Sequence, residues 1–226
     1  QTIIKKVLSD KALKLVGALE IYGHKNLGQD VGKILKTKNL GIKISDNIIN
    51  LFANTDAVID FTLPNATVDY AKYAAQARIV HVIGTTGLSS SQLKKIEYAS
   101  KHATIIKSGN MSLGVNLLET LVRQAASKLD TSFNIQINEE HHKHKIDAPS
   151  GTALMLGNAA AKGRNLKLDR VKKISRLNTK GSHSKDKIVF TSFRKGETVG
   201  NHEVIFSSPD ETINFQHKAN NRGIFA

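Results

Sequence analysis

The stretch from Glu139 to Asp147 concentrates side chains that could carry out acid–base chemistry. Its nine residues include three histidines, two lysines and three carboxylates. Imidazoles change their protonation state near neutral pH, so the histidines could exchange protons with a substrate. The lysines are cations that would attract a negatively charged substrate to the same place.

The residues that follow this stretch predict the start of a helix. Pro149, Ser150, Gly151 and Thr152 are typical of a helix N-terminus, and residues 153–156 begin an apolar helical run. The backbone amides of Gly151 and Thr152 would then point outward, unpaired, from the positive end of that helix, which suits a carboxylate or phosphate. An anion-binding helix end beside a proton donor is the arrangement needed to reduce a small acidic substrate.

Two other interpretations of the histidine-rich stretch stay open on composition alone. A run of histidines and lysines is often a solvated surface loop. A metal-dependent hydrolase could use His141, His142 and His144, although histidines this crowded lack the spaced carboxylates or thiolates of typical metal sites. We therefore expect no metal at this stretch.

The composition is that of an ordinary globular protein. The chain has 226 residues, of which 40% are hydrophobic and 23% charged, enough for one large or two small domains. No window approaches the length of a membrane-spanning segment, and residues 1–6 lack the form of a signal peptide. The absence of cysteine excludes disulfides and thiolate chemistry, so we expect a cytoplasmic location.

The formal net charge of +14 favours anionic ligands in general, including nucleic acid, dinucleotides and dicarboxylates. A basic nucleic-acid-binding module is therefore an alternative. It would be better supported by clustered basic residues interleaved with aromatic ones, yet aromatic residues make up only 5% of the chain and tryptophan is absent. We expect no nucleic-acid partner and no membrane partner.

Residues 1–112 alternate short apolar runs with helical patterns. Such β-α-β alternation predicts an α/β fold with a Rossmann-like, doubly wound parallel sheet. The helix that starts at Ser89 has a capping-box pattern with Gln92. The expected strands are 13–19, 57–61 (buried), 79–83 and 103–107, and the expected helices are 2–9, 65–76 and 89–101.

Polar and glycine-rich residues follow four of these strands. Glycine in any single loop could simply make a tight turn, but four such loops at one edge of a parallel sheet indicate a ligand site. Small residues would let a cofactor approach the backbone closely. The candidate cofactor-binding residues are Glu20, Phe61, Thr62, Gly84, Thr85, Thr86, Ser108, Gly109, Asn110 and Met111.

Glu20 matches the position of the acid that binds the adenosine ribose in a dinucleotide-binding domain, but no G-x-G-x-x-G turn precedes it. We expect that the sequence lacks its first strand and glycine turn; a member that binds dinucleotide poorly is the alternative. A carboxylate at Glu20 should repel a 2′-phosphate, although His24 or Lys25 could still reach one. The prediction is a preference for NADH, or use of both NADH and NADPH.

The pattern changes from residue 113. A helix at 114–128 with an apolar stripe, a strand at 133–137 and a helix at 152–163 are followed by strands without helices between them, at 171–177, 188–193, 198–207 and 212–217. Such a succession predicts an α+β domain with an open mixed sheet. The predicted stripe is Leu117, Leu118, Leu121, Val122 and Ala125. The polar segment 180–187 predicts a mobile loop.

The string at 139–153, E-E-H-H-K-H-K-I-D-A-P-S-G-T-A, resembles the E-x-H-H-x-x-K-x-D-A-P-S-G-T-A signature of the 4-hydroxy-tetrahydrodipicolinate reductase (dihydrodipicolinate reductase) family. Residues 217–226 resemble its H-x-A-x-x-R-x-x-F-A stretch, whereas 180–187 departs from the family pattern. The resemblance implies a cofactor domain (1–112, with 223–226 returning to it) and a substrate domain (113–222) that forms a homotetramer. It also implies NAD(P)H-dependent reduction in lysine (diaminopimelate) biosynthesis. Another two-domain dehydrogenase of a small anionic substrate is the alternative.

The resemblance further implies roles for individual residues. His141 would be the acid and Lys145 its partner. Asp147 is expected to be structural, and either orients that lysine or caps the helix. The cofactor would lie against the G-T-T segment at 84–86 and the N-x-S segment at 110–112. The residues expected to hold the substrate carboxylates are His142, Gly151, Thr152 and Arg222. Glu139 and Glu140, expected to pair with neighbouring lysines, have no predicted catalytic role, and His144 is expected at the surface.

Overall fold

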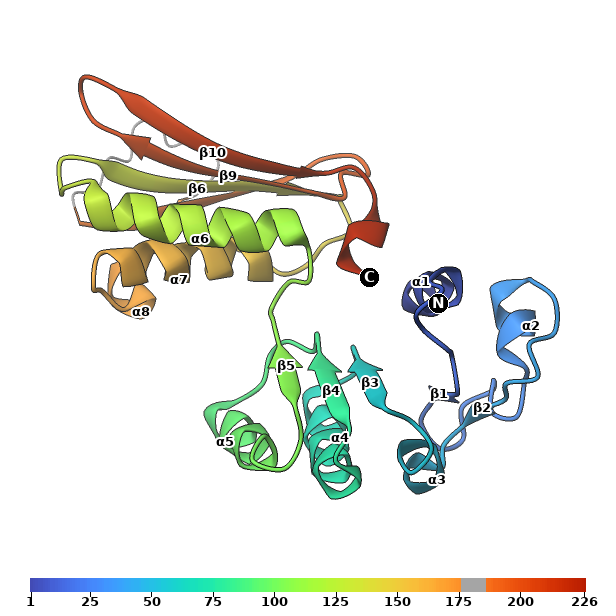
Figure 1. Ribbon diagram of the computed structural model, residues 1–226. Coiled ribbons are helices and arrows are strands. Elements are labelled where there is room, and N and C mark those ends of the chain that lie inside the picture. Colours follow the sequence, from blue (N-terminus) through green and yellow to red (C-terminus); the bar gives the residue numbers. More distant parts are fainter. Residues whose placement is uncertain (176–185) are drawn as a thin grey trace. The chain divides into compact units, whose positions relative to one another are not determined.

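The computed structural model describes residues 1–175 and 186–226 (Figure 1). The chain forms two compact units, Gln1–Ser108 together with Ala226, and Gly109–Phe225. Most of the loop predicted at 180–187 lies outside the described residues. Within the described part, no helix is both long and apolar enough to cross a membrane.

The first unit contains the predicted parallel sheet. Its strands β3 (Ala57–Asp60), β4 (Val80–Ile83) and β5 (Ile105–Lys107) pair in parallel in that order. Helices α4 (Pro64–Ala77) and α5 (Ser90–Ala99) connect them (Figure 1). Because parallel strands share one direction, the segments after β3, β4 and β5 leave the sheet at the same edge.

The start of α5 confirms the capping box predicted there. The Ser89 hydroxyl accepts a hydrogen bond from the Gln92 amide, and the Gln92 side chain accepts one from the Ser89 amide. Helix α1 (Thr2–Ser9) also lies where the sequence predicts it. Short helices that were not predicted are α2 (Val31–Leu35) and α3 (Ile48–Phe52).

Two strand predictions in the first unit were wrong in extent or burial. The strand expected at 13–19 is only β1 (Ala18–Leu19), because its partner β2 (Ile44–Ser45) offers just two pairing residues. Strand β3 is not buried throughout: the Ile59 side chain is 43% exposed. Strand β3 is an edge of the three-stranded sheet, so it has a neighbour on one side only.

The second unit confirms the predicted mixed sheet. Its strand order is β10-β9-β6-β8-β7, and the central strand β6 (Asn134–His141) runs antiparallel to β9 and parallel to β8. Helices α6 (Leu113–Lys128) and α7 (Gly151–Gly163) pack together and share one hydrophobic core with the sheet (Figure 1). The remaining elements are α8 (Leu168–Val171), β7 (Lys172–Ile174), β8 (Ile188–Arg194), β9 (Gly200–Ser207), β10 (Thr212–Ala219) and the 3-10 turn η1 (Arg222–Phe225).

Two helix and strand details in this unit differ from the prediction. Strand β6 continues past residue 137 to His141, because β8 pairs with it along that whole length. The buried face of α6 is also rotated: Leu117, predicted to be in the apolar stripe, is 60% exposed, whereas Val115 and Ala126 are buried. Strand β6 therefore carries the first residues of the histidine-rich stretch on rigid structure rather than in a loop.

Candidate active site

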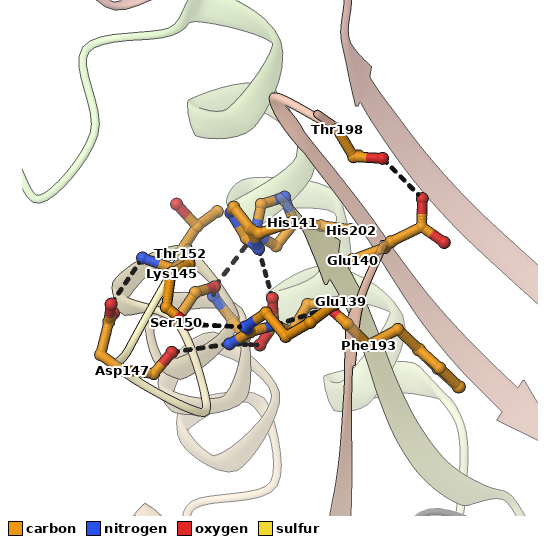
Figure 2. A network of polar contacts seen from close by, with 12 residues as sticks. Glu139, Glu140, His141, Lys145, Asp147, Ser150, Thr152, Phe193, Thr198 and His202 are labelled. Atoms are coloured by element: carbon orange, nitrogen blue, oxygen red, sulfur yellow. Dashed lines mark hydrogen bonds and ion pairs between the residues drawn. The ribbon is translucent and has the colours of Figure 1, made fainter. Parts of the chain in front are cut away.

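Strand geometry brings Glu139 and His141 onto one face of the second sheet. Side chains alternate between the two faces of a strand, and both residues belong to the buried set of β6, at 1% and 9% exposed. The register of β9 places His202 opposite Glu139, and that of β8 places Arg194 opposite His141. Three neighbouring strands thus contribute to one polar cluster beneath the start of α7 (Figure 2).

Glu139 and His141 form a buried carboxylate–histidine pair. Glu139 Oε2 is hydrogen-bonded to His141 Nδ1, and Arg194 Nη2 donates to Glu139 Oε1 over 3.0 Å. Burial by itself raises the pKa of Glu139, but the hydrogen bonds from His141 and Arg194 outweigh it and lower the pKa to about 2. A charged carboxylate can only accept, so Nδ1 carries a hydrogen and Nε2 is the nitrogen left to exchange a proton with a ligand: it accepts one in the neutral ring and releases one when both nitrogens are protonated.

The loop after β6 is fixed by Arg194 and by an ion pair within the loop. Arg194 donates from Nε to the Lys145 carbonyl over 3.2 Å and from Nη2 to the Asp147 carbonyl over 2.6 Å. Lys145 Nζ donates to Asp147 Oδ1 over 2.8 Å, a contact that the sequence predicted (Figure 2). This hydrogen bond is the main reason that the pKa of Asp147 lies below its ordinary value. Lys145 is therefore held in a defined position on the loop that follows the Glu139–His141 pair.

Helix α7 begins where the sequence predicts an anion-binding end. Ser150 is its N-cap, and the Ser150 hydroxyl accepts the Ala153 amide over 3.2 Å. Within the described residues, no hydrogen-bond acceptor faces the amides of Gly151 and Thr152. The space where a Gly151 side chain would lie is open. Two donors at the positive end of the helix are thus available to an anion.

Asn110 links the predicted cofactor segment to this helix end. Its Nδ2 donates to the Thr152 hydroxyl over 3.0 Å. Gly109 also lies close to α7, because a Cβ at this residue would be 3.8 Å from Met155 Sδ. Gly109, Asn110 and Met111 therefore belong to the second unit in the structure, although the sequence grouped them with the strand-end loops of the first.

His202 completes the cluster from strand β9. Its Nε2 is 3.2 Å from the Ser150 hydroxyl, and its ring lies edge-to-face with His141 at a centroid distance of 5.0 Å (Figure 2). Burial lowers the pKa of His202 to about 3, so this ring is neutral at physiological pH. Gly200 makes room for the pair, since a Cβ there would lie only 3.1 Å from His141 Nε2.

The remaining predicted substrate residues lie near the same loop. Burial and the positive charge of Arg222 both lower the pKa of His142. Arg222 therefore lies close enough to His142 for the two charges to interact. His142 and His144 have ring centroids 6.2 Å apart, and His144 is exposed as predicted. Glu140 projects from the other face of β6, where its carboxylate accepts the Thr198 hydroxyl over 3.0 Å. The predicted pairing of Glu139 and Glu140 with lysines was therefore wrong.

The described residues contain one set that could hold a metal ion. Glu139, His141 and His202 each offer a ligand atom, and these atoms lie within 4.8 Å of one another. This set differs from the one considered from the sequence, because His142 and His144 are replaced by Glu139 and His202. Both oxygens of Glu139 are already engaged, by His141 and by Arg194. A metal ion would compete with these two contacts, whereas proton transfer at His141 uses them as they stand.

The first unit presents its predicted cofactor residues at the edge formed by the ends of β3 and β4. Phe61 and Thr62 follow β3 and are exposed, as is Thr86 after β4. The Phe61 ring lies against Gly84, where a Cβ would approach it to 2.2 Å. Thr85 is the exception: its hydroxyl is buried and accepts the Thr62 amide over 3.0 Å, so only its backbone remains for a ligand.

The end of β1 offers a further predicted group. Glu20 Oε1 accepts the amide of Ile21 over 3.1 Å, and Glu20 Oε2 lies 3.9 Å from His24 Nδ1. Exposed hydroxyls, an aromatic ring and a carboxylate at strand ends fit the ribose and ring groups of a dinucleotide.

Four residues of this polar cluster have no catalytic or binding role predicted from the sequence: Glu139, Arg194, Gly200 and His202. A signal existed for Glu139, since it lies two positions before His141 and strand alternation puts such residues on one face. The other three come from β8 and β9 and follow Glu139 by more than fifty residues in the sequence. Their proximity depends on strand pairing, which the local sequence does not reveal.

Both halves of the chain match one enzyme family. Residues 1–111 match the family described as "Dihydrodipicolinate reductase, N-terminus", and residues 114–226 match "Dihydrodipicolinate reductase, C-terminus". The chain is 47% identical over 226 residues to the 4-hydroxy-tetrahydrodipicolinate reductase of Ruegeria pomeroyi, covering 100% of this chain and 84% of the relative. The corresponding enzyme of a Chelativorans species is 50% identical over 228 residues, covering 100% of this chain and 82% of that protein.

A solved structure shares the fold. It is described as dipicolinate-bound dihydrodipicolinate reductase from a Paenisporosarcina species. It superposes with a TM-score of 0.76 at 24% identity, covering 100% of this chain and 85% of that one. By its sequence over both halves, the chain belongs to the dihydrodipicolinate reductase family.

Proposed function

We propose that this protein uses NADH or NADPH to reduce 4-hydroxy-tetrahydrodipicolinate to tetrahydrodipicolinate, a step of lysine (diaminopimelate) biosynthesis. The observation that carries the proposal is the buried Glu139–His141 pair beside the open amides of Gly151 and Thr152. A proton donor and an anion-binding helix end are the two features that a dicarboxylate reductase needs. The relatives from Ruegeria and Chelativorans carry the name of this activity.

The substrate is a small dicarboxylic acid, so binding must be dominated by groups that recognise carboxylates. We assign one carboxylate to the amides of Gly151 and Thr152, and charge neutralisation to Arg222 and His142. Fixed donors hold the bound substrate in one orientation, and this orientation alone contributes part of the rate enhancement of the reaction.

Proton transfer is assigned to His141. After loss of water from the 4-hydroxyl group, the substrate is a conjugated imine, and the bound nicotinamide would supply the hydride. Negative charge then accumulates on the substrate ring, and His141, protonated on both nitrogens, would donate its Nε2 proton and become the neutral ring that keeps Nδ1–H against Glu139. Lys145 stabilises the developing charge from its position against Asp147.

Cofactor binding is assigned to the first unit and to the segment that leads into the second. The proposed residues are Glu20, Phe61, Thr62, Gly84, Thr85, Thr86, Ser108, Gly109, Asn110 and Met111, with Thr85 contributing its backbone. A carboxylate at Glu20 favours ribose hydroxyls over a 2′-phosphate. We expect a higher kcat/KM with NADH than with NADPH in the wild type, and a smaller ratio in Glu20→Gln. Equal efficiencies with both cofactors would contradict the repulsion argument.

The sheet of the second unit is the proposed oligomer contact. Helices α6 and α7 pack on one of its faces, and we assign its other face to a homotetramer of a cytoplasmic enzyme. Light scattering after size-exclusion chromatography should give four times the mass of the chain, and a monomeric mass would contradict this assignment.

The reaction can be followed through NADH and NADPH absorbance, with substrate made in situ from pyruvate and aspartate semialdehyde. His141→Gln should lower kcat by roughly 100- to 10,000-fold, the usual contribution of a general acid. Lys145→Ala should lower kcat and raise the substrate KM together. Wild-type kinetics in either variant would show that the residue assignment is wrong.

A further inference from the structure

Arg194 contacts both Glu139, the partner of His141, and the loop that carries Lys145. Its guanidinium donates to the carboxylate of Glu139 over 3.0 Å, to the Lys145 carbonyl over 3.2 Å and to the Asp147 carbonyl over 2.6 Å. The first acceptor lies on strand β6, and the other two lie on the loop that carries Lys145. One side chain therefore joins a strand to a loop that follows it.

The sheet register explains why an arginine can do this. Arg194 is the last residue of β8 and pairs with His141, the last residue of β6. Its side chain reaches back along the sheet to Glu139, and the loop returns over it so that two carbonyls face the guanidinium. A guanidinium is a rigid, planar fork of donors, so the directions of these hydrogen bonds are fixed relative to one another.

We propose that Arg194 is a positioning residue that makes the proton donor and the lysine one unit. It acts on His141 through Glu139, and on Lys145 through the backbone of the loop. The proposal rests on the roles given to His141 and Lys145 above. It goes beyond those roles because it predicts that a change at Arg194 impairs proton donation by His141 and charge stabilisation by Lys145 together.

The electrostatics of Glu139 support the same assignment. The hydrogen bond from Arg194 contributes to keeping this buried carboxylate charged. Replacing the fork by the ammonium of lysine keeps one positive charge but can satisfy fewer of the three acceptors. The contacts of residue 194 to Glu139 and to the loop would then both be weakened.

The chain offers a matched control in Arg164, the C-cap of α7. Arg164 Nη2 donates to the carbonyls of Asp130 and Phe133, over 3.1 and 2.6 Å, without touching the active-site cluster. Arg194→Lys and Arg164→Lys are therefore the same chemical change at two arginine–carbonyl contacts. We expect Arg194→Lys to lower kcat by about 10- to 100-fold and to raise the substrate KM several-fold, because misplaced groups lose orientation. Arg164→Lys should leave kcat and both KM values within about twofold of wild type.

A double-mutant cycle tests the coupling through Glu139. Glu139→Gln keeps the shape of the side chain, and it should lower kcat as Arg194→Lys does. The double variant should be no worse than the more damaged single variant, since both act on one unit. Fully multiplicative losses in the double variant would overturn the proposal, as would a kcat in Arg194→Lys equal to that of Arg164→Lys.

A readout independent of turnover separates this proposal from the proposed function. Hydrogen exchange of the amides of residues 142–148, measured by mass spectrometry, should accelerate by tenfold or more in Arg194→Lys and remain at the wild-type rate in Arg164→Lys. If the wild type reduced no substrate, the proposed function would fail while this measurement still judged the role of Arg194. Equal exchange in both variants and the wild type would overturn the positioning role.

Discussion

Each unit of the protein contains a buried carboxylate bound to a histidine, and the two pairs differ in what surrounds them. In the first unit, Asp60 Oδ2 lies 3.1 Å from His81 Nε2, and both side chains are fully sealed, at 1% and 0% exposed. In the second unit, Glu139 is equally buried, at 1% exposed, but its partner His141 keeps 9% of its surface exposed.

The partners of each carboxylate show the purpose of the pair. Asp60 Oδ1 accepts the amide and hydroxyl of Thr62 and the hydroxyl of Thr85, so it ties together the segments after β3 and β4. Glu139 instead accepts from an arginine and from a histidine that has its second nitrogen available. A carboxylate–histidine pair is therefore suited to catalysis only when the histidine nitrogen that does not bind the carboxylate can meet a ligand. A sealed pair fixes loops.

The largest expected effect is on the stability of the protein when the carboxylate of the sealed Asp60–His81 pair is replaced. Asp60→Asn removes a charged acceptor from several buried hydrogen bonds and should lower the free energy of unfolding by about 3 kcal/mol. Because the pair does not meet the substrate, kcat at saturating cofactor should fall by less than about threefold. Urea unfolding and steady-state kinetics measure the two quantities, with the exposed Asp56→Asn as control. A large loss of kcat at unchanged stability would refute the contrast.

The pH dependence of stability should reveal Glu139. Its pKa is about 2 in the folded protein, against an ordinary value of 4.5. A lowered pKa contributes stability that is fully present above pH 4.5 and is lost as the pH falls toward about 2. The full contribution is roughly 3 kcal/mol. The difference in unfolding free energy between wild type and Glu139→Gln should therefore shrink across this acidic window. A constant difference would contradict the lowered pKa.

A smaller effect is expected at the start of helix α7, the proposed anion-binding site of the second unit. Ser150→Ala removes the cap of α7 and the partner of His202 Nε2, so stability should fall by about 2 kcal/mol. The substrate KM should rise a few-fold, since the free amides of α7 lose their fixed position. Ser89→Ala at the start of α5 is the matched control: it should lose cap energy of about 1 kcal/mol without changing the substrate KM. Identical KM changes in both variants would argue against an anion site at α7.

The smallest expected effect concerns the space around His141 Nε2. Gly200→Ala would place a methyl group 3.1 Å from His141 Nε2 and shift the ring by a few tenths of an ångström. We expect kcat to fall by about threefold, because small displacements of a proton donor cost part of its contribution. Ser207→Ala on the same strand should have no effect on kcat. Unchanged kinetics in Gly200→Ala would mean that His141 tolerates the shift and that its placement is less demanding than proposed.

The sequence predicted those parts of the fold that local patterns determine. The capping box at Ser89 and Gln92 and the start of α7 depend on neighbouring residues, and both were correct. The exposed position of Leu117 was missed because periodicity defines an apolar face but not which side of it meets the core. Arg194 and His202 were missed because only the pairing of β6 with β8 and β9 brings them to Glu139.

The register of β6 has a consequence for how such a protein can change over time. Glu139, Arg194 and His202 meet because each occupies an inward position of its own strand, so inserting one residue within β9 would exchange His202 for a neighbouring residue of the strand at the cluster. Lineages should therefore tolerate length changes in the connections between strands but not inside them. The outward positions of β6, such as Asn138 and Glu140, are free of this constraint and can diversify while the chemistry persists.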